Sequence, residues 1–149
     1  KEIAAAVNIP VISSSLLQVR LVSSMLSPGK KVGIITAKAP ALSEKHFAGV
    51  DITDVDKVVY GIEDTEFGQT FFTDCNYIDL NLAEAEMIKV GQKMLRENPD
   101  VGAIVLECTN MPPFTRALQE ATGLPVFDVI NQIRYVHDAI VSPGYKGYL

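Results

Sequence analysis

The sequence predicts an α/β fold, in which a mostly parallel sheet carries helices on both of its faces. Two observations lead to this prediction. Short apolar segments rich in β-branched residues, such as Lys31–Thr36 and Val101–Leu106, alternate with helical patterns such as residues 79–98, and this alternation is typical of parallel sheets. The apolar segments are also nearly continuous, as expected for strands that are buried on both faces.

The composition excludes several classes of protein. The 149 residues are long enough to enclose a core, and 48% hydrophobic with 21% charged residues indicates a globular chain. A net charge of −5 without a basic cluster argues against a nucleic-acid partner. No apolar run is long enough to span a bilayer and no signal peptide is visible, so we expect no membrane partner and a cytoplasmic location.

The cysteines and histidines give little sign of a disulfide or a metal site. Cys75 and Cys108 are far apart in the sequence and do not form a disulfide framework, which agrees with a reducing compartment. His46 and His137 are isolated and lack the spacing of metal ligands. We therefore predict no metal.

The first 27 residues are predicted as helix, strand and helix. Residues 1–7 have the pattern of a helix end, and the chain begins at Lys1 inside it, which favours a fragment. Residues 9–12 are predicted as a strand with proline near its start. The serines at 13–15 supply an N-cap for a helix over residues 16–26. The side chains near one face of that helix are Leu17, Leu21, Ser24 and Met25.

The middle of the chain supplies two further strands. Lys31–Thr36 is predicted as a central strand, followed by a loop over residues 37–41 and a short helix over 42–48. Residues 58–62 form the next predicted strand. Residues 63–76 show no clear period but contain three phenylalanines, so we expect an irregular loop that packs on the core.

The last part of the chain repeats the strand and helix pattern. Residues 79–98 have the clearest helical spacing, carried by Leu80, Ala83, Met87, Val90, Met94 and Leu95. Val101–Leu106 is the fourth predicted strand, residues 112–122 a helix ended by Gly123, and residues 124–127 the fifth strand. The final helix, residues 128–141, places five side chains at core spacing: Ile130, Ile133, Val136, His137 and Ile140.

The turn that contains Cys108 is the candidate site. This cysteine follows a predicted strand and precedes a helix that opens with two prolines. Free N–H groups and the helix dipole at such a place favour an anion and lower the pKa of a thiol, while Thr109 and Asn110 add a hydroxyl and an amide. A cysteine at a strand end can equally be a small buried apolar residue. Glu107 could hold a proton or be solvated.

The sequence around this turn resembles the aspartate/glutamate/hydantoin racemase superfamily. The similar segments are ECTNMPP at residues 107–113, LQ at 118–119 and TGLPVFD at 122–128, and VGIITA at 32–37 is similar to the first strand of the family's second lobe. The resemblance covers most of the chain. It implies two similar α/β lobes with an active site between them, and no cofactor. Each lobe of a racemase contributes one cysteine, and the two cysteines lie on opposite sides of the substrate α-carbon.

The resemblance also assigns roles to residues. It makes Cys108 the catalytic cysteine of the second lobe, with Thr109, Asn110 and Thr36 as substrate-binding residues. It divides the chain into a partial first lobe at 1–27, a second lobe at 28–123, and a return to the first lobe at 124–149. The segments AAAVNIPV and QEATGLPV share one design of helix, stop and strand. In this scheme the first-lobe cysteine lies upstream of Lys1, and Cys75 is structural or incidental.

We therefore expect a cofactor-independent racemase-like enzyme that acts on a small carboxylate by cysteine acid/base chemistry. The 149-residue chain is expected to be inactive alone and to form a homodimer. The family also contains arylmalonate decarboxylases, which use one cysteine as a proton donor, and maleate isomerases, which use a cysteine nucleophile. Outside enzymes, the alternative is an inactive small-molecule or partner-binding module with an inert cysteine.

Overall fold

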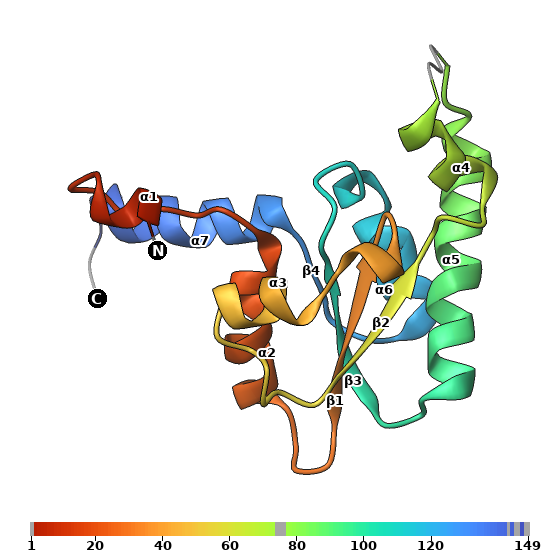
Figure 1. Cartoon of the computed structure of the whole chain (residues 1–149), viewed down its shortest axis with the longest axis horizontal. Helices are drawn as coiled ribbons and strands as arrows, with labels where there is room; N and C mark the ends of the chain where they lie inside the picture. Colours follow the sequence, from red (N-terminus) through yellow and green to blue (C-terminus); the bar gives the residue numbers. More distant parts are fainter. Residues whose placement is uncertain (1, 74–76, 143, 145–146, 148–149) are drawn as a thin grey trace.

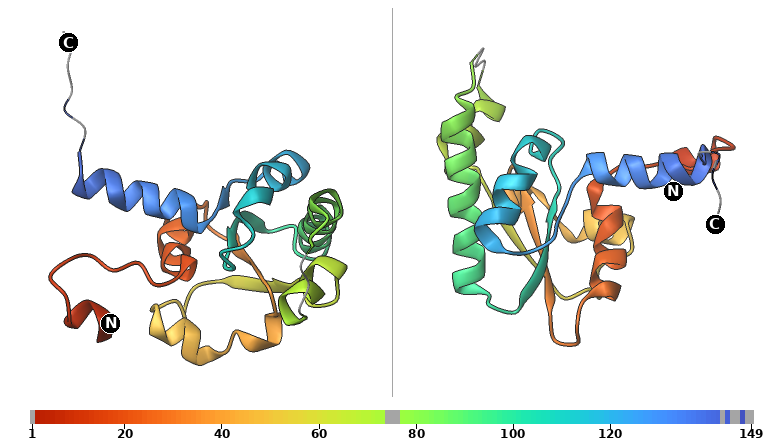
Figure 2. Two further views of the ribbon diagram at one scale, coloured as in Figure 1. Left: turned by 90° about the horizontal axis from the view of Figure 1, so that it is seen from above. Right: turned by 180° about the vertical axis from the view of Figure 1, so that it is seen from behind.

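The computed structural model describes residues 2–73, 77–142, 144 and 147, and its centre is a four-stranded sheet. All neighbouring strands run parallel, in the order β2-β1-β3-β4. The strands are β1 (Lys31–Thr36), β2 (Lys57–Gly61), β3 (Val101–Leu106) and β4 (Val126–Phe127). Figure 1 shows helices in front of and behind this sheet, and Figure 2 gives the other two views. The predicted α/β fold with a parallel sheet is confirmed.

Helices alternate with the strands along the chain. The α-helices are α1 (Glu2–Ala5), α2 (Gln18–Met25), α3 (Glu44–Gly49), α4 (Glu66–Gln69), α5 (Leu80–Glu97), α6 (Thr115–Thr122) and α7 (Val129–Ile140). Short 3-10 turns precede or follow some of them: η1 (Ser15–Leu17), η2 (Ala39–Ala41), η3 (Thr70–Phe72) and η4 (Pro112–Phe114).

The core has two layers because alternate side chains of each strand point to opposite faces of the sheet. On one face Ile35, Ile104 and Leu106 pack with residues of α4, α5 and α6. On the other face Ile34 and Val105 pack with residues of η1, α2 and α3. These five side chains are fully buried, which explains why β1 and β3 are almost continuously apolar.

Helix α5 covers one face in the way its spacing predicts. Asp79 caps it by accepting hydrogen bonds from the N–H groups of Asn81 and Leu82, and this satisfies donors that the helix leaves unpaired. Ala83, Met87 and Met94 on its inner side are buried. Leu80, also assigned to this stripe, is exposed at the start of the helix.

The segment without a clear period packs on the core, as expected, but contains the short helix α4. Thr65 caps this helix by accepting from the N–H of Gly68, and Glu86 of α5 accepts from the N–H of Phe67. The Phe67 ring is buried and lies edge-on to Phe114, with 5.1 Å between the ring centres. Cys75 lies outside the described residues.

The predicted strand over residues 9–12 is wrong. These residues have no regular structure, and Ile9 is 69% exposed. Pro10 has no N–H to donate to a ladder. The companion prediction for residues 124–127 is confirmed only over β4, which pairs with β3 and extends the same sheet.

Helix α7 does not bury the side chains that its spacing indicated. Ile130, Ile133 and Ile140 are between 43% and 59% exposed, because α7 leaves the end of β4 and projects away from the sheet (Figures 1 and 2). In α2 the stripe named above is likewise on the outside, with Leu21 51% exposed, and Val22 is buried instead. The apolar sides of α2 and α7 thus remain uncovered by the described residues.

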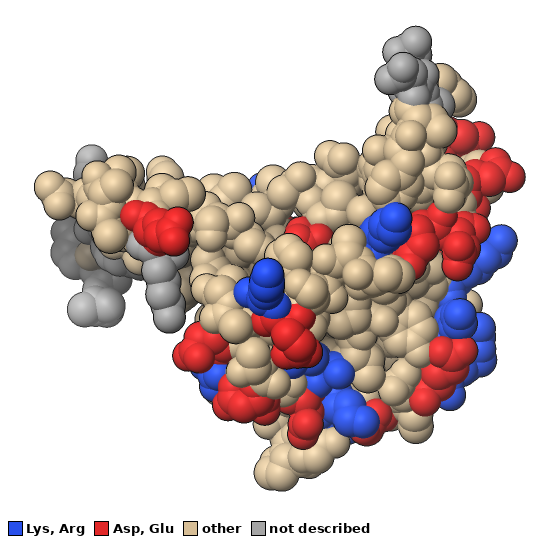
Figure 3. Space-filling view, viewed as in Figure 1, with Lys and Arg blue, Asp and Glu red and all other residues tan. Residues whose placement is uncertain are grey.

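Most of the charged side chains visible in Figure 3 lie on the body of the molecule, and one acidic group is visible on the arm that contains α1 and α7. In the part of the chain that the structure describes, no helix has the length and apolar character needed to cross a membrane. Helix α2 packs on the sheet formed by residues 31–127, so the described segments share one sheet. The division into lobes at residues 27 and 123 stays a prediction.

Gly68 generates a stability prediction. A Cβ added there would lie 1.7 Å from the carbonyl oxygen of Ile62, so backbone must move. We expect Gly68→Ala to lower the free energy of unfolding by about 1–3 kcal/mol. Gly49, in α3, is the matched control because a Cβ there meets nothing within 4 Å, and Gly49→Ala should be neutral or stabilising by up to about 1 kcal/mol. Equal urea midpoints for the two variants would contradict this.

Candidate functional site

The candidate site lies where the parallel strands end. Because all four strands run in one direction, their carboxyl ends share one edge of the sheet. The chain passes from β1 outward to β2 and then returns across β1 to β3, so the strand order reverses between β1 and β3. Ligands of open α/β sheets bind at such a reversal, outside the carboxyl ends of the strands. Thr36 and Glu107 lie at this point.

A hydrogen bond joins the ends of these two strands. The Thr36 hydroxyl donates to the Glu107 carboxylate, with 2.8 Å between Oγ1 and Oε2. The Glu107 N–H in turn donates to the carbonyl of Ile35 at 2.8 Å. Thr36 is buried and Glu107 is half-buried. The assignment of Thr36 to substrate binding stays a prediction. In the structure, the Thr36 hydroxyl orients the Glu107 carboxylate.

Cys108 is a free, half-buried thiol directly after Glu107. It packs against the core layer that contains Leu106. Burial raises the pKa of the Cys108 thiol, a hydrogen bond from the Asn110 N–H opposes this, and the negative charge of Glu107 raises the pKa further. The expectation that the helix start lowers this pKa is therefore wrong. Desolvation of the thiolate and the neighbouring carboxylate outweigh the one N–H group that favours the thiolate.

The loop after Cys108 leaves donors available to a ligand. Met111 donates its N–H to the Cys108 carbonyl at 3.2 Å, which closes the turn. Among the described residues, the N–H groups of Thr109 and Asn110 donate to no backbone carbonyl, and both residues are exposed. An incoming carboxylate could therefore be bound by the Thr109 N–H and its hydroxyl.

A cavity of about 270 Å³ lies next to this turn. Its polar lining is Ser13, Ser14, Ser15, Glu107 and Thr109, and its apolar lining is Ile12, Val129 and Ile133. At ~30 Å³ per molecule it has room for about nine waters, which suits a small substrate. The cavity brings together Glu107 and Thr109, whereas Cys108, Asn110 and Thr36 are outside its lining.

The serines of this cavity begin the helix that packs under the sheet. Ser14 accepts from the N–H of Leu16 at 3.1 Å and so caps η1. Ser15 is 1% exposed, and its hydroxyl has no hydrogen-bond partner among the described residues. A buried polar atom without a partner is uncommon. The sequence indicated these serines only as a helix cap.

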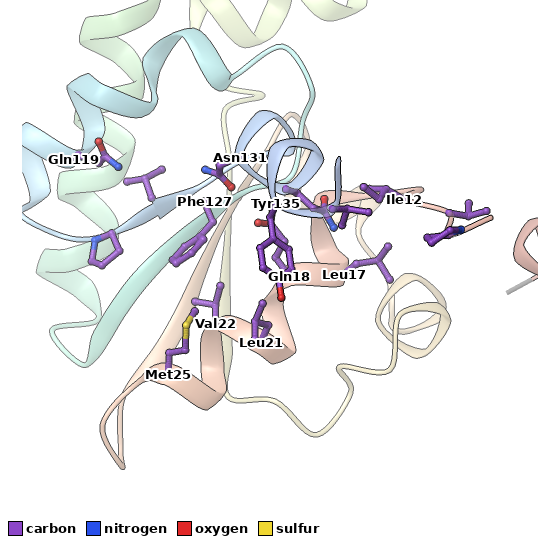
Figure 4. A pocket seen from close by; sticks show the side chains of 16 residues that line it. Ile12, Leu17, Gln18, Leu21, Val22, Met25, Gln119, Phe127, Asn131 and Tyr135 are labelled. Carbon is purple, nitrogen blue, oxygen red and sulfur yellow. The ribbon is translucent and has the colours of Figure 1, made fainter. Parts of the chain in front are cut away.

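A larger apolar groove of about 670 Å³ runs between α2 and α7 (Figure 4). Leu17, Leu21 and Met25 line one side, and Tyr135 of α7 and Phe127 of β4 line the other. The groove is formed by the apolar sides of α2 and α7 that the described residues leave uncovered. None of Cys108, Thr109 or Glu107 lines it.

Asp128 connects the elements that surround the cavity and the apolar groove. Its carboxylate accepts from the Thr115 hydroxyl at 2.6 Å and from the Asn131 N–H at 2.9 Å, and its carbonyl accepts from the Gln18 side chain at 3.0 Å. The residue is 5% exposed. It thereby joins α2, α6 and the start of α7. The sequence showed Asp128 at a helix start, but the contacts with Gln18 and Thr115 need the tertiary structure.

These features define a parallel α/β protein with a cavity at the carboxyl edge of its sheet and a cysteine turn beside that cavity. Residues 1–132 match the Asp/Glu/Hydantoin racemase family, so this chain belongs to that family of racemase-type enzymes. The resemblance of the ECTNMPP segment to this family is thereby confirmed.

Curated relatives carry another activity in their names. The dimethylsulfoniopropionate lyase of Durusdinium sp. clade D is 31% identical over 126 residues, which cover 81% of this chain and 42% of that protein. Dimethylsulfoniopropionate lyases 5 and 3 of Emiliania huxleyi (strain CCMP1516) are 23% and 28% identical over 139 and 130 residues. These matches cover 89% and 81% of this chain, and 27% and 34% of the relatives. The chain thus spans less than half the length of each.

The charge of Glu107 gives a prediction for Cys108. In the wild-type chain, alkylation of Cys108 by iodoacetamide should increase with pH through a midpoint above that of a free cysteine, about 8.5, because burial and Glu107 raise its pKa. Glu107→Gln removes the charge, so more thiolate forms at neutral pH and alkylation should be faster. Mass spectrometry of the peptide that contains Cys108 measures both rates.

Glu63→Gln is the control for this comparison. Glu63 follows β2 at the same edge and accepts the Ala39 N–H, but it is not a cause of the shifted Cys108 pKa. Its replacement should leave the alkylation profile unchanged. A wild-type midpoint below that of free cysteine would refute the account of the thiol given above.

Proposed function

We propose that this chain supplies the cysteine acid/base of an enzyme that removes the proton from the carbon next to a carboxylate. The observation that carries the proposal is the position of Cys108 in a family of racemase-type enzymes, at the carboxyl edge of the sheet and beside donors of Thr109 that suit a carboxylate. The Cys108 thiolate takes the proton, and hydrogen bonds to the carboxylate stabilise the charge that develops. The raised thiol pKa makes Cys108 a stronger base once it is deprotonated.

Two reactions can follow this step, and we favour elimination. In racemisation an acid on the opposite face returns a proton to the carbon. In elimination the electron pair of the broken C–H bond forms a C=C bond, and the leaving group departs with its own electrons. Dimethylsulfoniopropionate would thus give acrylate and dimethyl sulfide, with the proton on Cys108. This reaction requires one base, and Cys108 is the one cysteine within the described residues. For elimination we therefore propose that the chain is active by itself, in contrast to the expectation that it is inactive alone, which rested on the need of a racemase for two cysteines. The names of the relatives favour it as well.

Racemisation stays the second candidate because of the family to which the chain belongs. It needs a second acid on the far side of the substrate carbon, which the described residues do not provide as a thiol. We expect the 149-residue chain not to exchange the α-proton of aspartate, glutamate or a hydantoin with deuterium from solvent. Proton NMR in deuterated water measures this exchange.

Elimination predicts that release of dimethyl sulfide depends on Cys108. Gas chromatography of the vapour above a solution of the chain and dimethylsulfoniopropionate measures the rate. Cys108→Ala should lower this rate by at least about 100-fold, the usual contribution of a positioned base. Asn98→Ala, at the opposite end of the sheet, serves as the control. Release that is unchanged in Cys108→Ala, or α-proton exchange with aspartate at an enzyme-like rate, would refute the proposal.

We also propose that the chain forms a dimer through the apolar groove between α2 and α7. Leu21 and Met25 are exposed on one side of the groove and Tyr135 on the other, and covering such a surface is favourable by about 25 cal/mol per Å². A second copy presents the same apolar groove, so a symmetric contact covers both. Light scattering should give twice the mass of the chain, and Leu21→Glu should reduce it to the monomer. Lys45→Glu on α3 is the control, and a monomeric wild-type chain would contradict the proposal.

A further inference from the structure

The cavity of about 270 Å³ contains an unusual combination of groups. One half-buried carboxylate, Glu107, lies among apolar side chains and serine hydroxyls, and none of the described residues that line the cavity is a Lys, Arg or His. None of the ion pairs found among the described residues includes Glu107. A charge that is partly removed from water without a partner is costly. The described part of the chain therefore supplies no positive group to this cavity.

We propose that this cavity binds the positively charged end of the substrate, and that Glu107 selects a methylated onium cation there. This inference rests on the proposed function, because it places the substrate beside Cys108. The Thr36 hydroxyl donates to Oε2 of Glu107 and so orients the carboxylate, and no hydrogen bond to Oε1 is found among the described residues. Glu107 lines the cavity and is followed directly by Cys108, which lies outside the lining.

The lining distinguishes between kinds of cation. A metal ion needs several oxygen or nitrogen ligands, and no group of three or more His, Cys, Asp or Glu that could hold one occurs among the described residues. Ile12, Val129 and Ile133 offer apolar surface, which suits methyl groups around a sulfonium or quaternary ammonium centre. Such a cation is weakly hydrated and cannot donate N–H bonds, so one carboxylate and apolar walls are sufficient for it.

The opposite end of the substrate then meets the cysteine turn. Thr109 lines the cavity, and among the described residues its N–H donates to no backbone carbonyl. A short molecule with a cation at one end and a carboxylate at the other could therefore reach from the Glu107 side to the Thr109 N–H. Cys108 lies in the same turn, between Glu107 and Thr109, and its side chain packs against the core layer that contains Leu106. Glu107 is a specificity-determining residue in this scheme, and Cys108 performs the chemistry.

Binding of the trimethylsulfonium ion to the 149-residue chain tests the inference without any turnover. In amide NMR spectra the ion should shift the signals of Ser15 and Thr109 in a saturable way, and tert-butanol, an uncharged molecule of similar size, should not. Glu107→Gln keeps an oxygen that can accept the Thr36 hydroxyl but removes the charge. It should weaken binding at least about tenfold. Glu63→Gln should bind as the wild type does.

A second variant tests the inference independently, in case Glu107→Gln does not fold. Ile133 is 48% exposed, so Ile133→Phe can fill the cavity from α7 at little cost to folding, and it should abolish the shifts while Glu107 is intact. Binding that is equal in the wild type and in Glu107→Gln would overturn the inference, as would methylammonium binding more tightly than trimethylsulfonium.

The inference and the proposed function fail in different ways. If the chain releases dimethyl sulfide and Glu107→Gln has the same KM for dimethylsulfoniopropionate, the cation site is wrong and elimination stands. If trimethylsulfonium binding depends on Glu107 but no dimethyl sulfide is released, the cation site stands and elimination is wrong.

Discussion

The parallel pairing of β1 with β3 is the interaction on which the rest of the site depends. It aligns Ile34 with Val105 and Ile35 with Leu106, and the next hydrogen bond along, from the Glu107 N–H to the Ile35 carbonyl, carries the alignment past the end of the strand. The Thr36 hydroxyl therefore meets the Glu107 carboxylate. Since successive residues of a strand point to opposite faces, a shift of one residue in this register would turn these groups apart.

The sequence predicted the type of an element better than its neighbours. Apolar spacing indicates a helix or strand, but it does not show which other element covers the apolar side or pairs with the strand. The stripe of α5 identified Ala83, Met87 and Met94 as core because the sheet lies directly beneath them. The same spacing in α7 predicted that Ile133 is buried, and this is wrong. Apolar spacing shows which side of a helix is apolar but not whether another element covers that side. Residues 9–12 failed for a similar reason, since a strand needs a neighbour to accept its hydrogen bonds.

The sequence predicted where the turn that contains Cys108 lies, but not the direction in which the pKa of its thiol is shifted. A cysteine between an apolar strand and two prolines indicated a turn at a sheet edge, and the turn is there. The pKa of Cys108 depends on how deeply the thiol is buried and on the distance of Glu107, and neither can be read from spacing. Ser15 shows the same limit: a serine before a helix indicates a cap, and only the packed structure reveals a buried hydroxyl without a partner.

Glu107 links recognition to chemistry through its charge. Burial raises the pKa of the Cys108 thiol and the Glu107 carboxylate raises it further, so the thiol is less open to alkylation. A cation bound beside Glu107 offsets that negative charge, so the pKa of Cys108 falls and the thiolate forms when a substrate is present. A neutral or anionic molecule in the cavity brings no such change. The position of Glu107 between the cavity and the thiol would thus make the thiolate most abundant when the substrate that the cavity selects is bound.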